Sequence, residues 1–191
     1  RRAGYELMGN TAPETRETLA APSAPWLWGR YSALALWVAL ATFAIDQAHK
    51  FWMLYVYDIA AKGRVRVAPF LDLVFVKNTG ISYSLFNQDS QAGQYLLAGF
   101  AVVVSLALWV WIARSATGRL MAASLALIIG GALGNALDRV MIGGVADFFS
   151  AHAYGFYWYV FNIADVAIVA GVAGLLYDSL KPSSIVVKNS D

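Results

Sequence analysis

The sequence contains no cysteine and few charged residues. Without cysteine the chain has no disulfide bond, no thiol nucleophile and no cysteine metal site. Asp, Glu, Lys and Arg together make up 14% of the 191 residues, whereas soluble proteins average roughly 25%. The net charge of +2 is too small to indicate a nucleic-acid partner, and no run of basic residues is dense enough to predict a lipid-headgroup patch.

Several hydrolytic motifs are also missing. The chain has no GxSxG elbow, no HExxH motif and no GxGD motif, and its only histidines are His49 and His152. These absences argue against serine-elbow hydrolases and zinc proteases, and we predict neither a metal site nor a cofactor. An arrangement of Ser82 or Ser84 with Lys50 stays open, although nothing in the sequence fixes their contact.

Apolar residues make up 59% of the chain and gather in long runs. A bilayer core requires roughly 20 helical residues, and runs at 31–57, 92–113, 120–137 and 159–180 approach or exceed that length. A polar stretch of about 30 residues precedes the first run, unlike the short basic start of a cleavable signal peptide. Four spans that stay in the mature protein are therefore expected.

The loops between the runs predict a sheet and an orientation. Residues 64–76 alternate and then become rich in strand formers, which indicates a small β-sheet, whereas the glycine-rich and aromatic loop 139–158 favours turns at the membrane boundary. Basic residues are more frequent on the side of the two termini, most clearly at Arg114 and Arg119, so both termini are expected in the cytoplasm. We predict an all-α membrane protein of four transmembrane helices with a small extracytoplasmic β-sheet, a 31–180 domain, and polar tails at 1–30 and 181–191.

Polar residues interrupt the first and third runs. Asp46 and Lys50 are four residues apart and can form an ion pair on one helix face, for which a structural role is favoured over direct chemistry. Asn135, Asp138 and Arg139 share one face where the third helix ends, and a structural network and a functional site are both open for them. Just before them, Gly130 and Gly134 form a GxxxG pattern that permits close helix packing, and His49 is interpreted as an interfacial side chain.

Two further aspartates, Asp147 and Asp165, are expected at the outer membrane boundary. Asp165 could simply stabilise a helix N-terminus, and Asp147 could be a loop residue. If the two carboxylates converge, however, they can share one proton, so that one activates a water and the other protonates a carbonyl oxygen. The helix dipole favours Asp165 as the ionised member. The pair therefore predicts peptide hydrolysis without a covalent intermediate.

Four ordered blocks of the chain resemble the lipoprotein signal peptidases, also called signal peptidase II. "DQAHK" is similar to the family block DQxxK, "NTGISYSLF" to NxGxxFS, "GGALGNALDR" to GGxxGNxxDR, and "VADFF" with "FNIADVAI" to VxDF and FNxAD. The chain departs from the family at Ile81, Ser82 and Tyr83, where Ala-Ala-Phe is usual, so the local packing there is expected to differ.

The resemblance implies an aspartyl endopeptidase of the bacterial cytoplasmic membrane that cuts prolipoproteins before the diacylglyceryl-modified cysteine. Asp147 and Asp165 would be catalytic, and Asp46, Lys50 and Asp138 would hold the scaffold. The expected partners are prolipoproteins, membrane lipid and the cyclic peptide inhibitors of the family. Residues expected to line the substrate site are Asn78, Gly80, Asn135, Arg139 and Asn162.

Two other functions fit parts of the pattern. A proton-coupled transporter could use Asp46, Lys50 and Asp138 as a relay, but no inverted repeat or broken helix is visible in the sequence. A non-catalytic scaffold for lipidated partners would need only the GxxxG face and the aromatic residues. The lipoproteins cleaved, the oligomeric state, the pKa values of the aspartates and the gating loop are beyond what the sequence predicts.

Overall fold

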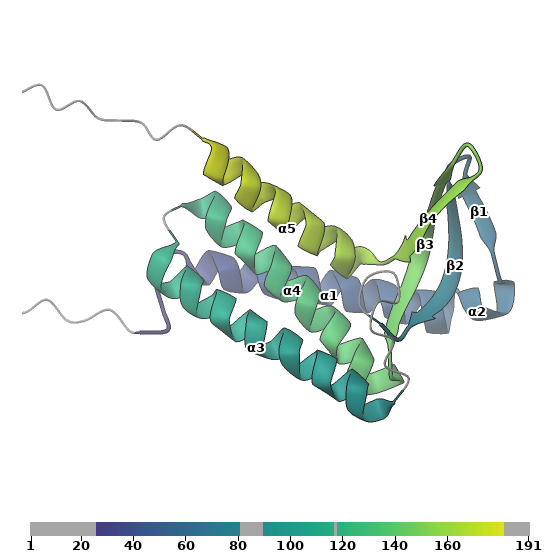
Figure 1. Cartoon of the computed structure of the whole chain (residues 1–191), viewed down its shortest axis with the longest axis horizontal. Helices are drawn as coiled ribbons and strands as arrows, with labels where there is room; N and C mark the ends of the chain where they lie inside the picture. The colour runs from purple at the N-terminus through teal and green to yellow at the C-terminus, as the bar shows by residue number, and fades with distance from the viewer. Residues whose placement is uncertain (1–25, 81–89, 117, 182–191) are drawn as a thin grey trace, which may run out of the picture.

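Four long helices and one small sheet make up the fold in a computed structural model of the chain, which describes residues 26–80, 90–116 and 118–181 (Figure 1). The helices lie side by side, and the sheet stands at one end of them. Most of each predicted tail lies outside the described residues. The long helices are α1 (Ser32–Phe51), α3 (Gln91–Ser115), α4 (Arg119–Ile142) and α5 (Ile163–Leu180). A π-helix, η1 (Trp52–Val56), and one helical turn, α2 (Ile59–Lys62), follow α1.

Helix α4 is the centre of the bundle, because it packs against α1, α3 and α5. Glycine makes this close packing possible. A Cβ atom on Gly130 would lie 2.6 Å from the carbonyl oxygen of Ala39 in α1, and one on Gly134 would lie 2.5 Å from Asp46 Oδ2, also in α1. Both distances are shorter than a side-chain carbon tolerates. The close helix approach predicted from the GxxxG pattern is therefore confirmed.

Helices α3, α4 and α5 are long and apolar enough to cross a membrane. Their outward faces remain apolar, as at Leu96 and Phe100 of α3, which are 73% and 68% exposed. An apolar exterior of this kind suits a lipid environment. Helix α1 does not reach the same mean hydropathy, because its last turns contain Asp46, Gln47, His49 and Lys50.

The sheet is antiparallel, with the strand order β1-β2-β3-β4. Strands β1 (Val65–Ala68) and β2 (Leu71–Asn78) correspond to the predicted strand region. Strands β3 (Val145–Ala153) and β4 (Phe156–Phe161) come from the segment predicted as a loop and from the start of the run at 159–180. The predicted loop at 139–158 and the predicted start of the fourth span at residue 159 were therefore wrong. The hairpin forms because Tyr154 and Gly155 both adopt positive φ angles, of 51° and 82°, as a tight hairpin turn requires.

Candidate active site

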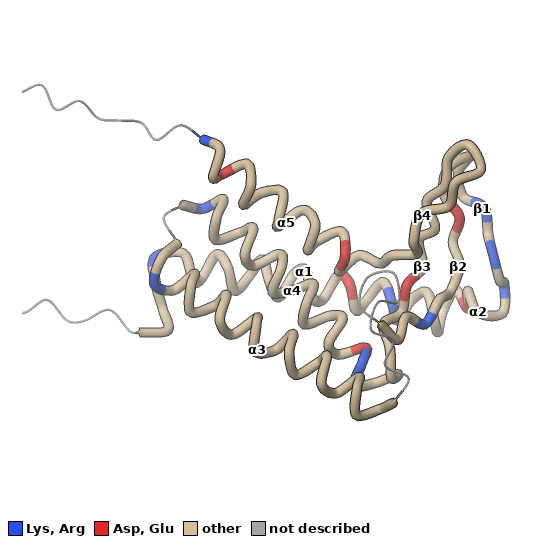
Figure 2. The backbone as a smooth tube through the Cα atoms, viewed as in Figure 1, with Lys and Arg blue, Asp and Glu red and all other residues tan. Residues whose placement is uncertain are grey.

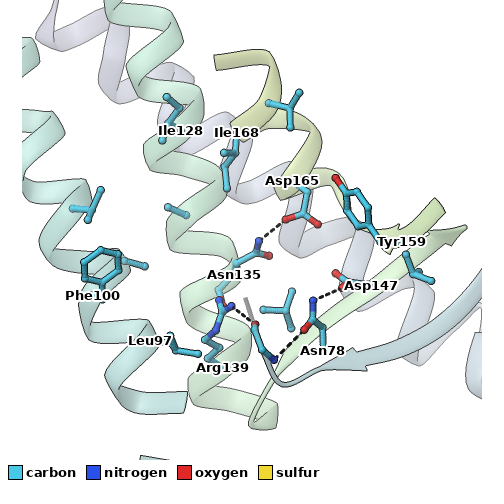
Figure 3. Close-up of a pocket in the computed structure, with 17 residues that line it drawn as sticks. Asn78, Leu97, Phe100, Ile128, Asn135, Arg139, Asp147, Tyr159, Asp165 and Ile168 are labelled. Atoms are coloured by element: carbon cyan, nitrogen blue, oxygen red, sulfur yellow. Dashed lines mark hydrogen bonds between the residues drawn. The ribbon is translucent and has the colours of Figure 1, made fainter. Parts of the chain in front are cut away.

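A pocket of about 390 Å³ opens between α3, α4, α5 and the sheet. Most of its walls are apolar, with Leu97 and Phe100 on the α3 side and Ile168 on the α5 side (Figure 3). The polar side chains gather at the end of the pocket nearest the sheet. Five of them belong to the predicted site: Asn78, Asn135, Arg139, Asp147 and Asp165. An apolar trough with few convergent polar groups is the usual form of a binding site for a small or extended ligand.

Asp147 reaches the pocket from β3, where it is paired with Val76 of β2. Its carboxylate is 2% exposed and accepts two hydrogen bonds. The side-chain amide of Asn78 donates to Oδ2 at 3.2 Å, and that of Asn162 donates to Oδ1 at 2.7 Å. Asp147 is thus held in a strand by two amides, and its interpretation as a loop residue was wrong.

Asp165 reaches the same pocket from the first turn of α5. Asn162 caps this helix, because its Oδ1 accepts from the backbone N–H of Asp165 at 3.0 Å and its own N–H donates to Asp165 Oδ2 at 3.2 Å. The amide of Asn135 in α4 donates to Asp165 Oδ1 at 2.9 Å. Asp165 thus lies at a helix N-terminus, as one of the two interpretations of the sequence required. Asp165 also lines the pocket, which a capping residue alone need not do.

The environment of Asp147, including the charge of Asp165, favours its protonated form. Burial, followed by the nearby charge of Asp165, raises the pKa of Asp147 from its usual 3.8 to about 7, although the amides of Asn78 and Asn162 and the charge of Lys50 oppose the change. The neutral acid therefore persists near neutral pH. A proton donor that is still protonated at neutral pH is what general acid catalysis needs.

Lys50 of α1 is buried next to Asn135, with 3% of the residue exposed. Its Nζ lies 2.8 Å from Asp46 Oδ2 and 2.8 Å from Asp138 Oδ2, and it donates to Asn135 Oδ1 at 3.0 Å. An ammonium group has three N–H donors, and these three acceptors can use all of them. The ion pair predicted from the spacing of Asp46 and Lys50 is confirmed, and Asp138 joins it.

The two acids that contact Lys50 also hold the chain next to each pocket aspartate. Asp46 Oδ1 accepts from the backbone N–H of Ala164, the residue before Asp165, at 3.0 Å. Asp138 Oδ2 accepts from the backbone N–H of Ala146, the residue before Asp147, at 3.1 Å. Lys50 is thereby connected to the backbone beside both pocket aspartates: through Asp46 to Ala164, and through Asp138 to Ala146.

Arg139 and Gly80 form the wall nearest the end of β2. The Arg139 guanidinium donates to the carbonyl oxygens of Asn135 and Gly80, at 3.1 and 3.2 Å. The N–H of Gly80 in turn donates to Asn78 Oδ1 at 3.0 Å, so the amide of Asn78 is oriented with its nitrogen toward Asp147. Every predicted substrate-site residue therefore lies in or directly beside the pocket.

Sequence reasoning missed Gln47 and Tyr159. Gln47 Nε2 lies 3.1 Å from Asp46 Oδ2, Asp138 Oδ1 and the carbonyl oxygen of Gly134, and its place in the DQxxK block was the available signal. Tyr159 lines the pocket from β4, and only the strand assignment could have placed it there. His49 stacks on Phe149 with ring centroids 5.2 Å apart. Ser82 and Ser84 lie outside the described residues.

Comparison with known proteins identifies the family. The family model described as "Signal peptidase (SPase) II" matches residues 38–181. The chain belongs to the signal peptidase II family. This match covers every polar residue of the site, from Asp46 to Asp165, and confirms the resemblance noted in the sequence.

Curated relatives agree with membership of the signal peptidase II family, and two solved structures share its fold. A lipoprotein signal peptidase of Methylocella silvestris is 52% identical over 143 residues, which is 75% of this chain and 83% of that protein. One from Rhodopseudomonas palustris is 51% identical over 151 residues, covering 77% and 92%. Two solved structures of a bacterial membrane enzyme have TM-scores of 0.69 and 0.67 at 24% and 25% identity, covering 83% and 79% of this chain and 94% and 95% of theirs.

Proposed function

We propose that this chain is a membrane aspartyl endopeptidase that removes the signal peptide from prolipoproteins by cutting before the diacylglyceryl-modified cysteine. Membership of the signal peptidase II family supports a protease that acts on prolipoproteins. The observation that carries the aspartyl mechanism is the shared pocket of Asp147 and Asp165, on separate elements and joined through Asn162.

In the proposed reaction the two carboxylates share one proton. Asp165, at the positive end of the α5 dipole, takes a proton from a water as the water oxygen attacks the scissile carbonyl carbon. Asp147, with a pKa of about 7, gives its proton to the carbonyl oxygen, which produces a neutral gem-diol. A gem-diol hydroxyl then returns its proton to the Asp147 carboxylate while Asp165 protonates the leaving nitrogen, so the C–N bond breaks and the products are a carboxylic acid and an amine.

The remaining polar residues are assigned to substrate binding. Asn78, Asn135, Arg139 and Asn162 present amide or guanidinium groups around the pocket and can bind the peptide backbone near the scissile bond. The apolar walls, with Leu97, Phe100 and Ile168 among them, can accept the acyl chains or apolar residues of the substrate. A lipid-anchored peptide bond is delivered at the membrane surface, where it can meet water.

The proposed topology places four spans in the bacterial inner membrane. Helices α3, α4 and α5 have the required length and hydropathy, and α1 packs against α4 along the same bundle. In α1 the charged pair is buried against α4 rather than exposed to lipid, which offsets the cost of placing charges in a membrane. Both termini would then be cytoplasmic, with the sheet and the pocket mouth on the outer side. Cyclic peptides that mimic the substrate near its scissile bond would compete for this pocket.

The test is cleavage of a purified lipidated prolipoprotein by the purified chain and by its Asp147→Asn and Asp165→Asn variants. Each variant should lose about 10²–10⁴-fold in kcat, because either one removes a proton-transfer group, while substrate binding is largely kept. Asp72→Asn is the control for Asp147→Asn, because Asp72 is as buried as Asp147 but lies in the sheet beside Arg64. Full cleavage by both site variants would disprove the aspartyl mechanism, and absence of cleavage by the unaltered chain would favour a binding scaffold.

A further inference from the structure

The bundle end opposite the sheet carries a group of basic residues (Figure 2). Arg30 precedes α1, Arg114 is in the last turn of α3, Arg119 begins α4, and Lys181 follows α5. We call these four residues the basic rim. All four are exposed. Arg114 and Arg119 flank the short link between α3 and α4, whereas Arg30 and Lys181 are distant in the sequence and join them only through the packing of the helix ends.

The basic rim is poorly neutralised. Asp178, near the end of α5, lies 3.6 Å from Lys181. Across the described ranges 26–80, 90–116 and 118–181, no carboxylate forms an ion pair with Arg30, Arg114 or Arg119. Among the residues that the structure describes, four cations against one acid leave a local excess of positive charge, which favours an anionic partner.

Residues 26–30 fold back on the end of α3 and place aromatic rings beside these cations. Trp109 Nε1 donates to the carbonyl oxygen of Leu27 at 3.2 Å, and the rings of Trp28 and Trp109 have centroids 6.1 Å apart. Gly29 packs so closely on the carbonyl oxygen of Ala113 that a Cβ atom has no room there. The segment is therefore held in a defined place rather than only tethered to α1.

The exposed rings of this segment complete a surface suited to a lipid headgroup. Trp26 and Trp28 are 62% and 46% exposed, and the Arg114 guanidinium lies 5.4 Å from the centre of the Trp26 ring. Tryptophan is favoured at the headgroup depth of a membrane, and a guanidinium stacked on a ring keeps its N–H donors for a phosphate. A free phosphate could bind the cations, but it has no apolar group that would contact the rings of Trp26 and Trp28.

We propose that the basic rim, together with Trp26 and Trp28, binds the headgroup of an anionic phospholipid. The surface lies at the far end of the bundle from the pocket, so this binding is separate from the peptidase reaction. It shares with the proposed function only the placement of the chain in a membrane. The occupant is identified by charge complementarity, because the excess of cations favours an anionic headgroup over a zwitterionic one.

The test measures the thermal stability and tryptophan fluorescence of the whole chain in neutral detergent during titration with phosphatidylglycerol or phosphatidylcholine. Phosphatidylglycerol should stabilise the protein and phosphatidylcholine should not. Each cation near an anionic surface strengthens binding about fivefold, so Arg30→Gln/Arg114→Gln should weaken the apparent affinity for phosphatidylglycerol by more than about tenfold. The matched control is Lys62→Gln/Arg66→Gln, which removes two exposed cations at the sheet end and should keep the affinity. Added salt should weaken binding.

Brominated lipids test the same proposal without any substitution. Brominated phosphatidylglycerol should quench the tryptophan fluorescence of the unaltered protein at lower concentration than brominated phosphatidylcholine does. Equal responses to the two lipids, equal losses in the two double variants, or full stabilisation by soluble glycerol phosphate would each overturn the proposal. Prolipoprotein cleavage in neutral detergent should be unchanged in Arg30→Gln/Arg114→Gln, so failure of lipid binding is distinguishable from failure of the proposed peptidase function.

Discussion

Asp147 is deeply buried and lies within the electrostatic influence of Asp165, so its protonation state has consequences for activity. Since its pKa lies at about 7, Asp147 is neutral below neutral pH and becomes charged as the pH rises through that value. As the proposed proton donor it must be protonated, so kcat should fall as the pH increases above about 7. The measurement is the pH dependence of kcat for prolipoprotein cleavage with substrate in excess.

The pH dependence of stability provides an independent check on the raised pKa of Asp147. The folded pKa of Asp147 lies above the usual value of 3.8, so the folded protein binds the proton more tightly than the unfolded chain does. The free energy of unfolding should therefore decrease as the pH rises from about 4 to about 7. Asp147→Asn cannot ionise and should flatten this part of the profile. An identical slope in that variant would contradict the raised pKa.

Asn162 has two separable tasks at the residue scale. Its Oδ1 caps α5, whereas its Nδ2 donates to Asp147. Asn162→Ala removes both and should cost about 1 kcal/mol of stability through the lost cap, with a large loss of kcat. Serine caps helices about as well as asparagine but has no amide to reach Asp147. Asn162→Ser should therefore keep the thermal stability and still lose kcat, and retention of full activity would show that the Asp147 contact is dispensable.

At the scale of elements, the distance between α4 and α5 determines where Asp165 lies. A Cβ atom on Gly131 would lie 2.5 Å from the carbonyl oxygen of Ala164 and 2.9 Å from Ile168 Cγ1. Gly131→Ala should therefore push the first turn of α5 away, with a loss of about 1–3 kcal/mol and a fall in kcat. Thermal unfolding and single-turnover cleavage measure the two effects.

Two other glycines serve as controls for this prediction. A Cβ atom on Gly171 would lie 2.5 Å from the carbonyl oxygen of Ser124, so Gly171→Ala crowds the same helix pair about two turns of α5 beyond Asp165. It should lower stability by a similar amount with a smaller effect on kcat. Gly99 on α3 has no atom within 4 Å of an added Cβ, and Gly99→Ala should be neutral. Equal loss of kcat in all three variants would rule out local displacement of Asp165.

Helices and strands were predictable where a single hydrophobic periodicity, or the length of an apolar run, was enough to assign them. The runs at 92–113 and 120–137 became α3 and α4 because long apolar stretches have few alternatives in a membrane. Strands β3 and β4 were missed because their segment is rich in aromatic residues and flanked by glycines, a composition that fits an interfacial loop equally well. The strand β4 became visible only through its pairing with β3, and Tyr159 reached the pocket with it.

The sequence predicted which residues belong to the site, but not the hydrogen bonds that connect them. Residue type and motif placed Asp147, Asp165 and Asn135 in one group, because each block supplies a polar side chain near the end of a span. The contacts of Asp46 with Ala164 and of Asp138 with Ala146 involve backbone N–H groups, which no side-chain pattern records. Their discovery required the tertiary fold.

At the scale of the whole molecule, Lys50 links the bundle to the sheet. Its ammonium pairs with Asp46 of α1 and Asp138 of α4, and those carboxylates hold the start of α5 and the start of β3. Lys50→Met should cost about 3–5 kcal/mol, because removal of one partner leaves two buried carboxylates without their cation. It should also lower kcat, because both pocket aspartates lose their support.

A charge-balanced variant separates these two effects. Asp46→Asn/Lys50→Met removes one charge of each sign, and asparagine can still accept from the Ala164 N–H, so thermal stability should recover partly relative to Lys50→Met. The kcat value should stay low, because Asn135 no longer has the ammonium that orients its amide toward Asp165. Arg64→Met, at the half-exposed ion pair with Asp72, should cost less than about 1 kcal/mol and leave kcat unchanged. Recovery of kcat in step with stability would mean that Lys50 serves the fold alone, since a positioning role requires activity to remain impaired in a protein that is folded.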